Sequence, residues 1–185
     1  LSVPGKYNVY NALAALSVCE TMGIDLESAC KALSNFSGVK RRFDIKANED
    51  IMIIDDYAHH PVEVKNVIET VKSNWNKNLN VIFQPHLFSR TKEFYKDFAK
   101  ALMIADNVII TEIFGSREKE DNSTTSDLII NEMLKLNHKN VSYVSSKDIV
   151  EEVKSIGVKG DIFLTMGAGN TVSYTHLTLP TIYSV

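Results

Sequence analysis

The sequence predicts an α/β fold built around a parallel sheet, and the order of its apolar segments is the main evidence. From Phe43 onward, short apolar runs alternate with longer amphipathic segments, a rhythm typical of repeated βαβ units. Helices cover both faces of such a sheet, so its strands are apolar throughout. The expected strands are Ile51–Ile54, Asn80–Phe83, Val108–Ile113, Val141–Val144 and Asp161–Thr165, and the expected helices are Pro61–Ser73, Lys92–Ala105, Ser126–Leu136 and Lys147–Ile156.

A helical segment precedes this α/β region. The run Val9–Met22 is rich in Ala and Leu and stops at Gly23, a residue suited to the position just after a helix. Asp25 is a suitable N-cap for a second helix, Leu26–Leu33. Because Ser37 and Gly38 then break the pattern, we place a domain boundary between residues 1–38 and residues 39–171.

Right-handed crossovers place all strand-to-helix loops of a parallel sheet at one edge, where ligands bind in open α/β sheets. Those loops contain most of the unusual chemistry of this chain: DDYAHHP (55–61), QPHLFSRT (84–91), EIFGSREKEDNS (112–123) and TMGAGN (165–170). We therefore expect their side chains to meet at a single edge.

Composition excludes several classes of protein. The chain has 20 basic and 23 acidic residues and a net charge of -3, so no broad footprint for nucleic acid or an anionic membrane is present. No apolar run approaches the roughly 20 residues of a membrane helix, and no signal-peptide pattern opens the chain. We expect a cytoplasmic protein in which Cys19 and Cys30 are reduced, buried thiols. Composition gives no oligomeric state.

The start of the sequence suggests a piece of a longer protein, and its end has an unusual composition. The chain opens with Leu1 and enters a helix almost at once. Residues 172–185 (VSYTHLTLPTIYSV) contain no Lys, Arg, Asp or Glu and resemble a translated sequencing adapter, so we expect this tail to be non-native. The alternative is a native, β-prone edge strand.

The DDYAHHP loop is the strongest candidate for chemistry. We expect Asp55 to finish the strand and Asp56 to point from its end, where it can accept from a ribose hydroxyl or orient a metal-bound water. Tyr57 and His59 would flank Asp56. His60 precedes Pro61, which suits the first turn of a helix, so His60 can equally serve as a helix cap.

The QPHLFSRT loop presents His86 and Arg90 four residues apart, near the start of a helix. Helix N-termini favour anions, and a guanidinium adds full charge, so this pair suits a carboxylate or phosphate. The alternative is a surface pair of Arg90 with Glu93, worth about 0.2–0.5 kcal/mol.

Weaker signals lie elsewhere in the chain. Asn8 and Asn11 share a helix face and offer the donors and acceptors that an adenine edge requires, although Asn8 can also simply cap the helix. Arg41 and Arg42 can hold phosphate from a linker, with solvated charge as the default. Gly167–Gly169 permits close backbone approach, and Ser116–Asp121 is expected to be a solvated surface. Neither a Walker-type phosphate loop nor a zinc spacing occurs.

Five segments in a fixed order resemble the C-terminal part of the Mur ligases: PGKYNVYNALAAL, GVKRRFD, DDYAHHP, FQPHLFSRT and MGAGN. The resemblance runs from Val3 to about Thr171 and is greatest to the branch that joins L-alanine to UDP-N-acetylmuramate. Tyr7 and Leu87 depart from it, since many relatives have His at the first position and some have Arg at the second.

The resemblance implies a three-domain cytoplasmic enzyme of peptidoglycan synthesis. Residues 1–38 would be a helical remnant of its central ATPase domain, and residues 39–171 a parallel-sheet, dinucleotide-fold-like C-terminal domain. In that family ATP phosphorylates the carboxylate of UDP-N-acetylmuramate, the amine of L-alanine attacks the acyl phosphate, and Mg²⁺ neutralises charge. The phosphate loop and the Mg²⁺ ligands would lie mainly outside this chain, so we expect no metal ligands here and no turnover by the chain alone.

Site roles follow from the resemblance residue by residue. It implies that Asn8 and Asn11 hold the adenine, and that Arg42 and Asp56 contact the phosphate and ribose of the nucleotide. Tyr57, His59, His86 and Arg90 would line the amino-acid pocket, with His59 and His86 as catalytic residues and Arg90 holding the carboxylate of alanine.

Three other functions stay open at this point. A muropeptide-recycling ligase of the same family would join a tripeptide to the same sugar. A non-catalytic α/β module would bind a nucleotide or an amino acid at the same edge. A metal hydrolase would use Asp55, Asp56, His59, His60 and His86 as ligands, although adjacent histidines in a turn rarely present both rings to one ion.

Overall fold

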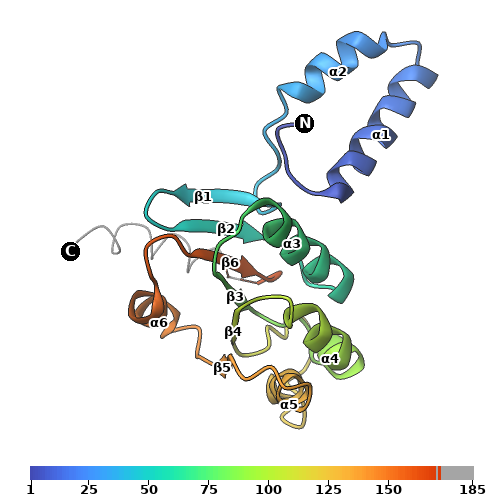
Figure 1. The fold of residues 1–185 in the computed structure, drawn as a ribbon. Coiled ribbons are helices and arrows are strands. Elements are labelled where there is room, and N and C mark those ends of the chain that lie inside the picture. The colour runs from blue at the N-terminus through green and yellow to red at the C-terminus, as the bar shows by residue number, and fades with distance from the viewer. Residues whose placement is uncertain (170, 172–185) are drawn as a thin grey trace.

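The computed structural model describes residues 1–169 and 171, and the expectation for the tail at 172–185 lies outside this part of the chain. Its centre is a six-stranded sheet in the order β1-β2-β6-β3-β4-β5 (Figure 1). The strands are β1 (Asp44–Asn48), β2 (Met52–Asp56), β3 (Leu79–Phe83), β4 (Asn107–Ile110), β5 (Val141–Tyr143) and β6 (Ile162–Met166). All neighbours pair in parallel except β1 with β2, so the predicted α/β class is confirmed.

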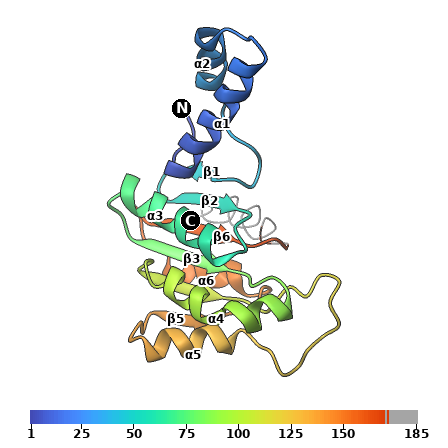
Figure 2. The same cartoon turned by 90° about the vertical axis from the view of Figure 1, so that its right-hand side faces the viewer.

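Helices cover the two faces of the sheet unequally. Figures 1 and 2 show α3 (Pro61–Asn74), α4 (Phe88–Leu102) and α5 (Asp127–Lys135) on one face and α6 (Ile149–Ile156) on the other. In the larger core, Ile68 of α3, Phe98 of α4 and Met133 of α5 pack against the sheet. A smaller core places Ile149 and Val153 of α6 on the opposite face.

The first two helices extend away from the sheet and pack against each other (Figure 1). They are α1 (Lys6–Thr21) and α2 (Leu26–Ser34). The Asp25 carboxylate accepts from the Ser28 backbone N–H at 2.8 Å, which confirms the predicted N-cap of α2. Cys30 is exposed and Cys19 only half-buried, so the expectation of buried thiols was wrong, because this helical pair buries almost none of its side chains. The domain boundary at residue 38 stays a prediction.

Several element boundaries differ from those expected. Strand β2 includes Asp56, and β4 ends at Ile110 rather than Ile113. Helix α4 begins at Phe88 rather than Lys92, which places Arg90 in its first turn. Strand β1 was missed because its antiparallel pairing with β2 carries a bulge between Ile45 and Ala47, which disrupts the alternation that identifies a strand.

Strand register sets the position of the site. Strand β6 lies between β2 and β3, and Met166 is level with both Asp56 and Phe83. The loops that follow these three strands therefore leave the sheet side by side. An isolated parallel bridge between His86 and Phe114 brings the loop after β4 to the same edge. Within the described residues, no helix combines the length and apolar character needed to cross a bilayer.

Candidate functional site

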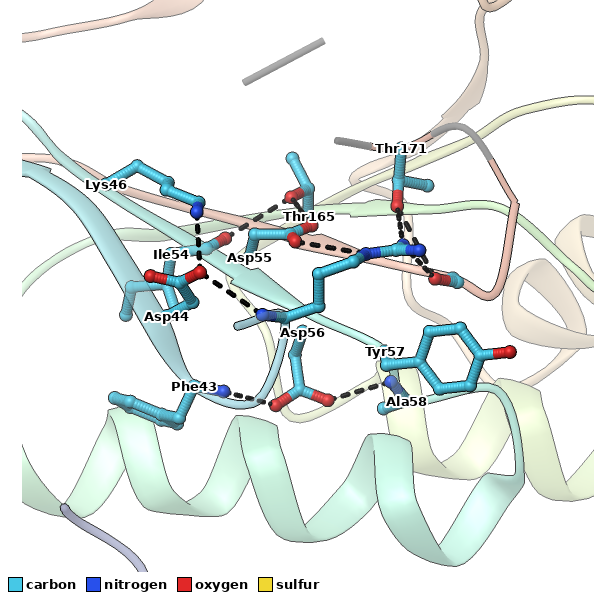
Figure 3. A network of polar contacts seen from close by, with 12 residues as sticks. Phe43, Asp44, Lys46, Ile54, Asp55, Asp56, Tyr57, Ala58, Thr165 and Thr171 are labelled. Atoms are coloured by element: carbon cyan, nitrogen blue, oxygen red, sulfur yellow. Dashed lines mark hydrogen bonds and ion pairs between the residues drawn. The ribbon is translucent and has the colours of Figure 1, made fainter. Parts of the chain in front are cut away.

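The end of β2 places two carboxylates on opposite sides of the strand (Figure 3). The Asp55 side chain is fully buried; its Oδ1 accepts from Thr165 Oγ1 at 3.0 Å and its Oδ2 from Arg41 Nε at 3.4 Å. Asp56 was expected to point from the end of the strand; it is instead the last residue of β2 and is buried, although it still lines the cavity described below. Its two oxygens accept from the backbone N–H groups of Phe43 and Ala58, both at 2.7 Å, because a carboxylate buried this deeply requires donors.

Burial raises the pKa of Asp56 to about 6 against the lowering effect of its two backbone donors, with Asp55 adding to the rise. A raised pKa in the folded state means that Asp56 stabilises the fold most below the unfolded value of 3.8, and that this contribution is lost as pH rises through about 6. We expect the side-chain carbon of Asp56 to titrate near pH 6 by ¹³C NMR. A midpoint at or below 3.8 would show that the two donors outweigh burial.

A cavity of about 580 Å³ lies between α1 and the β2–α3 loop. The predicted nucleotide-binding residues Asn8, Asn11, Arg42 and Asp56 all line it, together with Tyr57. Much of the rest of the wall is apolar, contributed by Val3, Ala12, Ala15, Leu33 and Phe36. The volume lies within the range of small-molecule pockets, and an apolar wall with a few polar groups suits a planar ring.

Asn8 was predicted either to bind adenine or simply to cap its helix, and the structure shows that it is not the N-cap. The N-cap of α1 is Gly5, and the Asn8 side chain donates to the Pro4 carbonyl at 2.7 Å. Asn11 Nδ2 donates to Asn8 Oδ1 at 3.4 Å, so the two amides form one pair. Tyr7 also lines the cavity, and burial, with Asp56 adding, raises its pKa to about 12. Tyr7 was not among the residues predicted to bind the nucleotide, because its position differs from the family pattern.

The four residues predicted to line the amino-acid pocket, Tyr57, His59, His86 and Arg90, come from the loop after β2 and from the loop and first helical turn after β3. The His59 and His86 rings are 5.6 Å apart, edge to face, and Arg90 Nη1 contacts His86 Nδ1 at 3.1 Å and the His59 carbonyl at 3.4 Å. Tyr57 packs edge-on against His59 at 5.0 Å. The structure therefore brings all four of these predicted residues together, and Arg90 contacts the histidines instead of Glu93.

The partners of the two imidazoles set the role of each Nδ1. A carbonyl only accepts, so His59 Nδ1 donates to the Tyr57 carbonyl at 2.8 Å, and Nε2 is the ring nitrogen without this contact. A guanidinium only donates, so His86 Nδ1 accepts from Arg90 and its hydrogen is on Nε2. Burial, with the nearby charge of Arg90, lowers the pKa of His86, which agrees with a neutral ring.

His60 serves α3 rather than the site. Its Nδ1 accepts from the Val62 backbone N–H at 3.4 Å, and Glu63 completes a capping box by accepting from the His60 N–H at 3.1 Å. Among the residues that the structure describes, no three His, Cys, Asp or Glu side chains form a group that could hold a metal ion. The geometry thus gives no support to the metal hydrolase built from Asp55, Asp56, His59, His60 and His86.

The loop after β4 contributes two side chains that sequence reasoning missed. Phe114 stacks on His86 with ring centroids 5.9 Å apart. Glu118 accepts from the Ser89 hydroxyl and from the Ser89 backbone N–H, so it caps α4, whose own N-cap residue Leu87 makes no side-chain cap. Ser116–Asp121 is largely exposed, as expected, and Glu118 caps α4 in addition. The cap joins residues 29 positions apart, which no local pattern reveals.

Comparison with known proteins gives a consistent result. The curated UDP-N-acetylmuramate--L-alanine ligase of Caldanaerobacter subterraneus is 43% identical over 172 residues, covering 92% of this chain and 37% of the relative. The corresponding protein of Clostridium tetani is 38% identical over 92% of this chain. This chain therefore spans less than two fifths of the length of these relatives.

Solved structures agree with the sequence relatives. The UDP-N-acetylmuramate-alanine ligase MurC of Thermotoga maritima matches with a TM-score of 0.78 and 34% identity, over 96% of this chain and 38% of that one. A murein peptide ligase from Psychrobacter arcticus, 24% identical with a TM-score of 0.72, shares the fold over 98% of this chain and 38% of its own. The family model described as Mur ligase, glutamate ligase domain, matches residues 41–169. The chain belongs to the Mur ligase family.

Proposed function

We propose that this chain is part of an ATP-dependent ligase that joins L-alanine to UDP-N-acetylmuramate through an acyl phosphate, in the cytoplasm, during peptidoglycan synthesis. The names of the relatives at about 40% identity support this substrate pair. The chain spans 37% of the length of the first of these relatives, so the activity is proposed for the complete enzyme.

One observation carries the proposal: a single short loop joins a nucleotide-sized cavity to a group that suits an amino acid. Tyr57 lines the cavity, its ring packs on His59, and His59 packs on His86, which accepts from Arg90. A ligase that uses ATP to activate one substrate for attack by another requires its two sites to be adjacent in this way.

The cavity would hold the nucleotide. The paired amides of Asn8 and Asn11 would read the edge of the adenine, with the apolar wall against its face. The exposed Arg42 would meet a phosphate, and Asp56 would contact the ribose at the floor of the cavity. ATP supplies the phosphoryl group that activates the sugar carboxylate. No three His, Cys, Asp or Glu side chains of the described residues come together as a metal site, and the Mg²⁺ ligands would lie mainly in the rest of the enzyme.

The second group would hold and activate L-alanine. Arg90 uses only Nη1 in its contacts to His59 and His86, and its other N–H groups can bind the carboxylate of alanine. His59 Nε2 would accept the proton that the ammonium group must lose before its nitrogen attacks the acyl phosphate. His86 Nε2–H would donate to an anionic oxygen as the tetrahedral intermediate forms and phosphate leaves.

The test requires the complete ligase. With ATP and UDP-N-acetylmuramate supplied, we expect phosphate release to depend on L-alanine and to be far slower with the tripeptide L-alanyl-γ-D-glutamyl-diaminopimelate. Preference for the tripeptide would assign the chain to a recycling ligase. Nucleotide binding without phosphate release with either acceptor would indicate a non-catalytic module.

A further inference from the structure

Arg41, the neighbour of the proposed phosphate contact, has a side chain that crosses from the linker before β1 to the turn after β6. Its Nη2 donates to the Gly167 carbonyl at 2.7 Å and to Thr171 Oγ1 at 3.0 Å. Its Nε donates to the buried Asp55 carboxylate at 3.4 Å. Dashed lines in Figure 3 mark these contacts beside the labelled Asp55 and Thr171. One guanidinium thus joins segments that are 126 or more residues apart in sequence.

The backbone of Arg41 is held as firmly as its side chain. Its carbonyl accepts from the Tyr57 N–H at 2.7 Å, and its N–H donates to Asp44 Oδ2 at 3.1 Å. The guanidinium also lies over the Tyr57 ring, 5.1 Å from its centroid. Tyr57 is therefore fixed by Arg41 at both its backbone and its ring.

The conformation of the linker explains why such anchoring is needed. Arg41 and Phe43 both have left-handed backbones, with φ of 60° and 50°, which non-glycine residues adopt only when their surroundings impose it. Phe43 is held by other partners than Arg41: its ring stacks on that of Trp75 with centroids 5.9 Å apart, and its N–H donates to Asp56. With both neighbours held inward, Arg42 between them is exposed and lines the cavity.

We propose that Arg41 is a positioning residue that holds the linker and Tyr57 in the conformation presenting Arg42 to the cavity. It acts by donating simultaneously to the β6 turn and to Asp55. The proposal rests on the proposed function only for the role of Arg42 toward a nucleotide. The competing explanation is that Arg41 merely neutralises the buried charge of Asp55, which a lysine would do equally well.

Amide hydrogen exchange of the full chain, followed by NMR without nucleotide, distinguishes the two explanations. In Arg41→Ala we expect the amides of Phe43 and Tyr57 to exchange about tenfold faster or more, while those of Val81 and Ile82 in β3 keep their rates. Arg41→Lys should show the same local loss, because an ammonium lacks the planar fork that reaches three partners. Lys40→Ala, an exposed neighbour of the same charge, should leave all four rates unchanged.

Two outcomes would overturn the proposal. Full protection of Phe43 and Tyr57 in Arg41→Lys would reduce Arg41 to a counter-charge, and equal acceleration of the β3 amides would make it a general stabilising residue. If Arg41→Ala fails to fold, Thr171→Val decides, since it removes one acceptor and leaves Asp55 paired. In Thr171→Val, faster amide exchange confined to Phe43 and Tyr57 supports the positioning role of Arg41, and unchanged exchange rates contradict that role.

Titration of the same samples with ADP tests the link to the nucleotide separately. We expect shifts at the amides of Tyr7 and Arg42 in the unaltered chain, and a several-fold weaker response in Arg41→Lys. Absence of shifts in the unaltered chain would count against the proposed nucleotide site, while the exchange rates would still decide the role of Arg41. An undiminished ADP response in Arg41→Lys would contradict positioning of Arg42.

Discussion

Arg90→Ala in the complete ligase is expected to raise KM for L-alanine by about 30- to 700-fold and to leave KM for ATP nearly unchanged. The reason is that removing the guanidinium that binds the substrate carboxylate costs about 2–4 kcal/mol of binding free energy, a value between that of a charged hydrogen bond and that of a buried ion pair. Each 1.4 kcal/mol or so of binding free energy changes the affinity about tenfold. Arg90 contacts His86 and is not among the residues that line the cavity, so the substitution should affect L-alanine and not ATP. Steady-state kinetics with each substrate varied in turn measures both constants.

Two further variants refine the result for Arg90. Arg90→Lys keeps the charge but loses the planar fork, so its effect on KM for L-alanine should be intermediate. Arg117→Ala removes an exposed guanidinium from the neighbouring loop and should change neither constant. Equal increases in both KM values for Arg90→Ala would refute the assigned role.

His59→Ala is expected to lower kcat by about 10²- to 10⁴-fold, the range associated with a positioned general base. The His59 ring has its Nδ1 occupied by the Tyr57 carbonyl, so Nε2 is the atom available to accept a proton. The adjacent His60 provides a matched control. His60→Asn retains a good N-cap for α3 and should leave kcat near that of the unaltered enzyme.

The comparison of these two histidines is informative because a nonspecific disturbance of the loop would affect both. Similar losses in His59→Ala and His60→Asn would show that the loop tolerates no change and would remove the assignment of His59 as the base. A selective loss in His59→Ala, measured with all substrates saturating, is the expected result.

Local patterns predicted the features of this chain that depend on local chemistry. The N-cap at Asp25 and the helix beginning at Pro61 follow from side chains that bond within a few residues of themselves. The sequence also predicted that His59 lies close to His86 and Arg90. Right-handed crossovers place the loops that follow parallel strands at the same edge of the sheet.

Long-range contacts could not be predicted in the same way. Nothing near Glu118 indicates that it caps α4, and nothing near Arg41 indicates a contact with Gly167. The inward orientation of Asp56 depends on the backbone N–H of Phe43, which approaches only because the linker adopts left-handed φ values. Such features arise from the packing of distant segments, which a single sequence does not display.

The most direct test of the account is a crystal structure of the complete ligase with ADP and L-alanine bound. The account predicts the adenine against Asn8 and Asn11, the carboxylate of alanine on Arg90, and the Tyr57–His60 loop in contact with both ligands. A nucleotide bound away from the cavity, or an alanine carboxylate that does not touch Arg90, would contradict it.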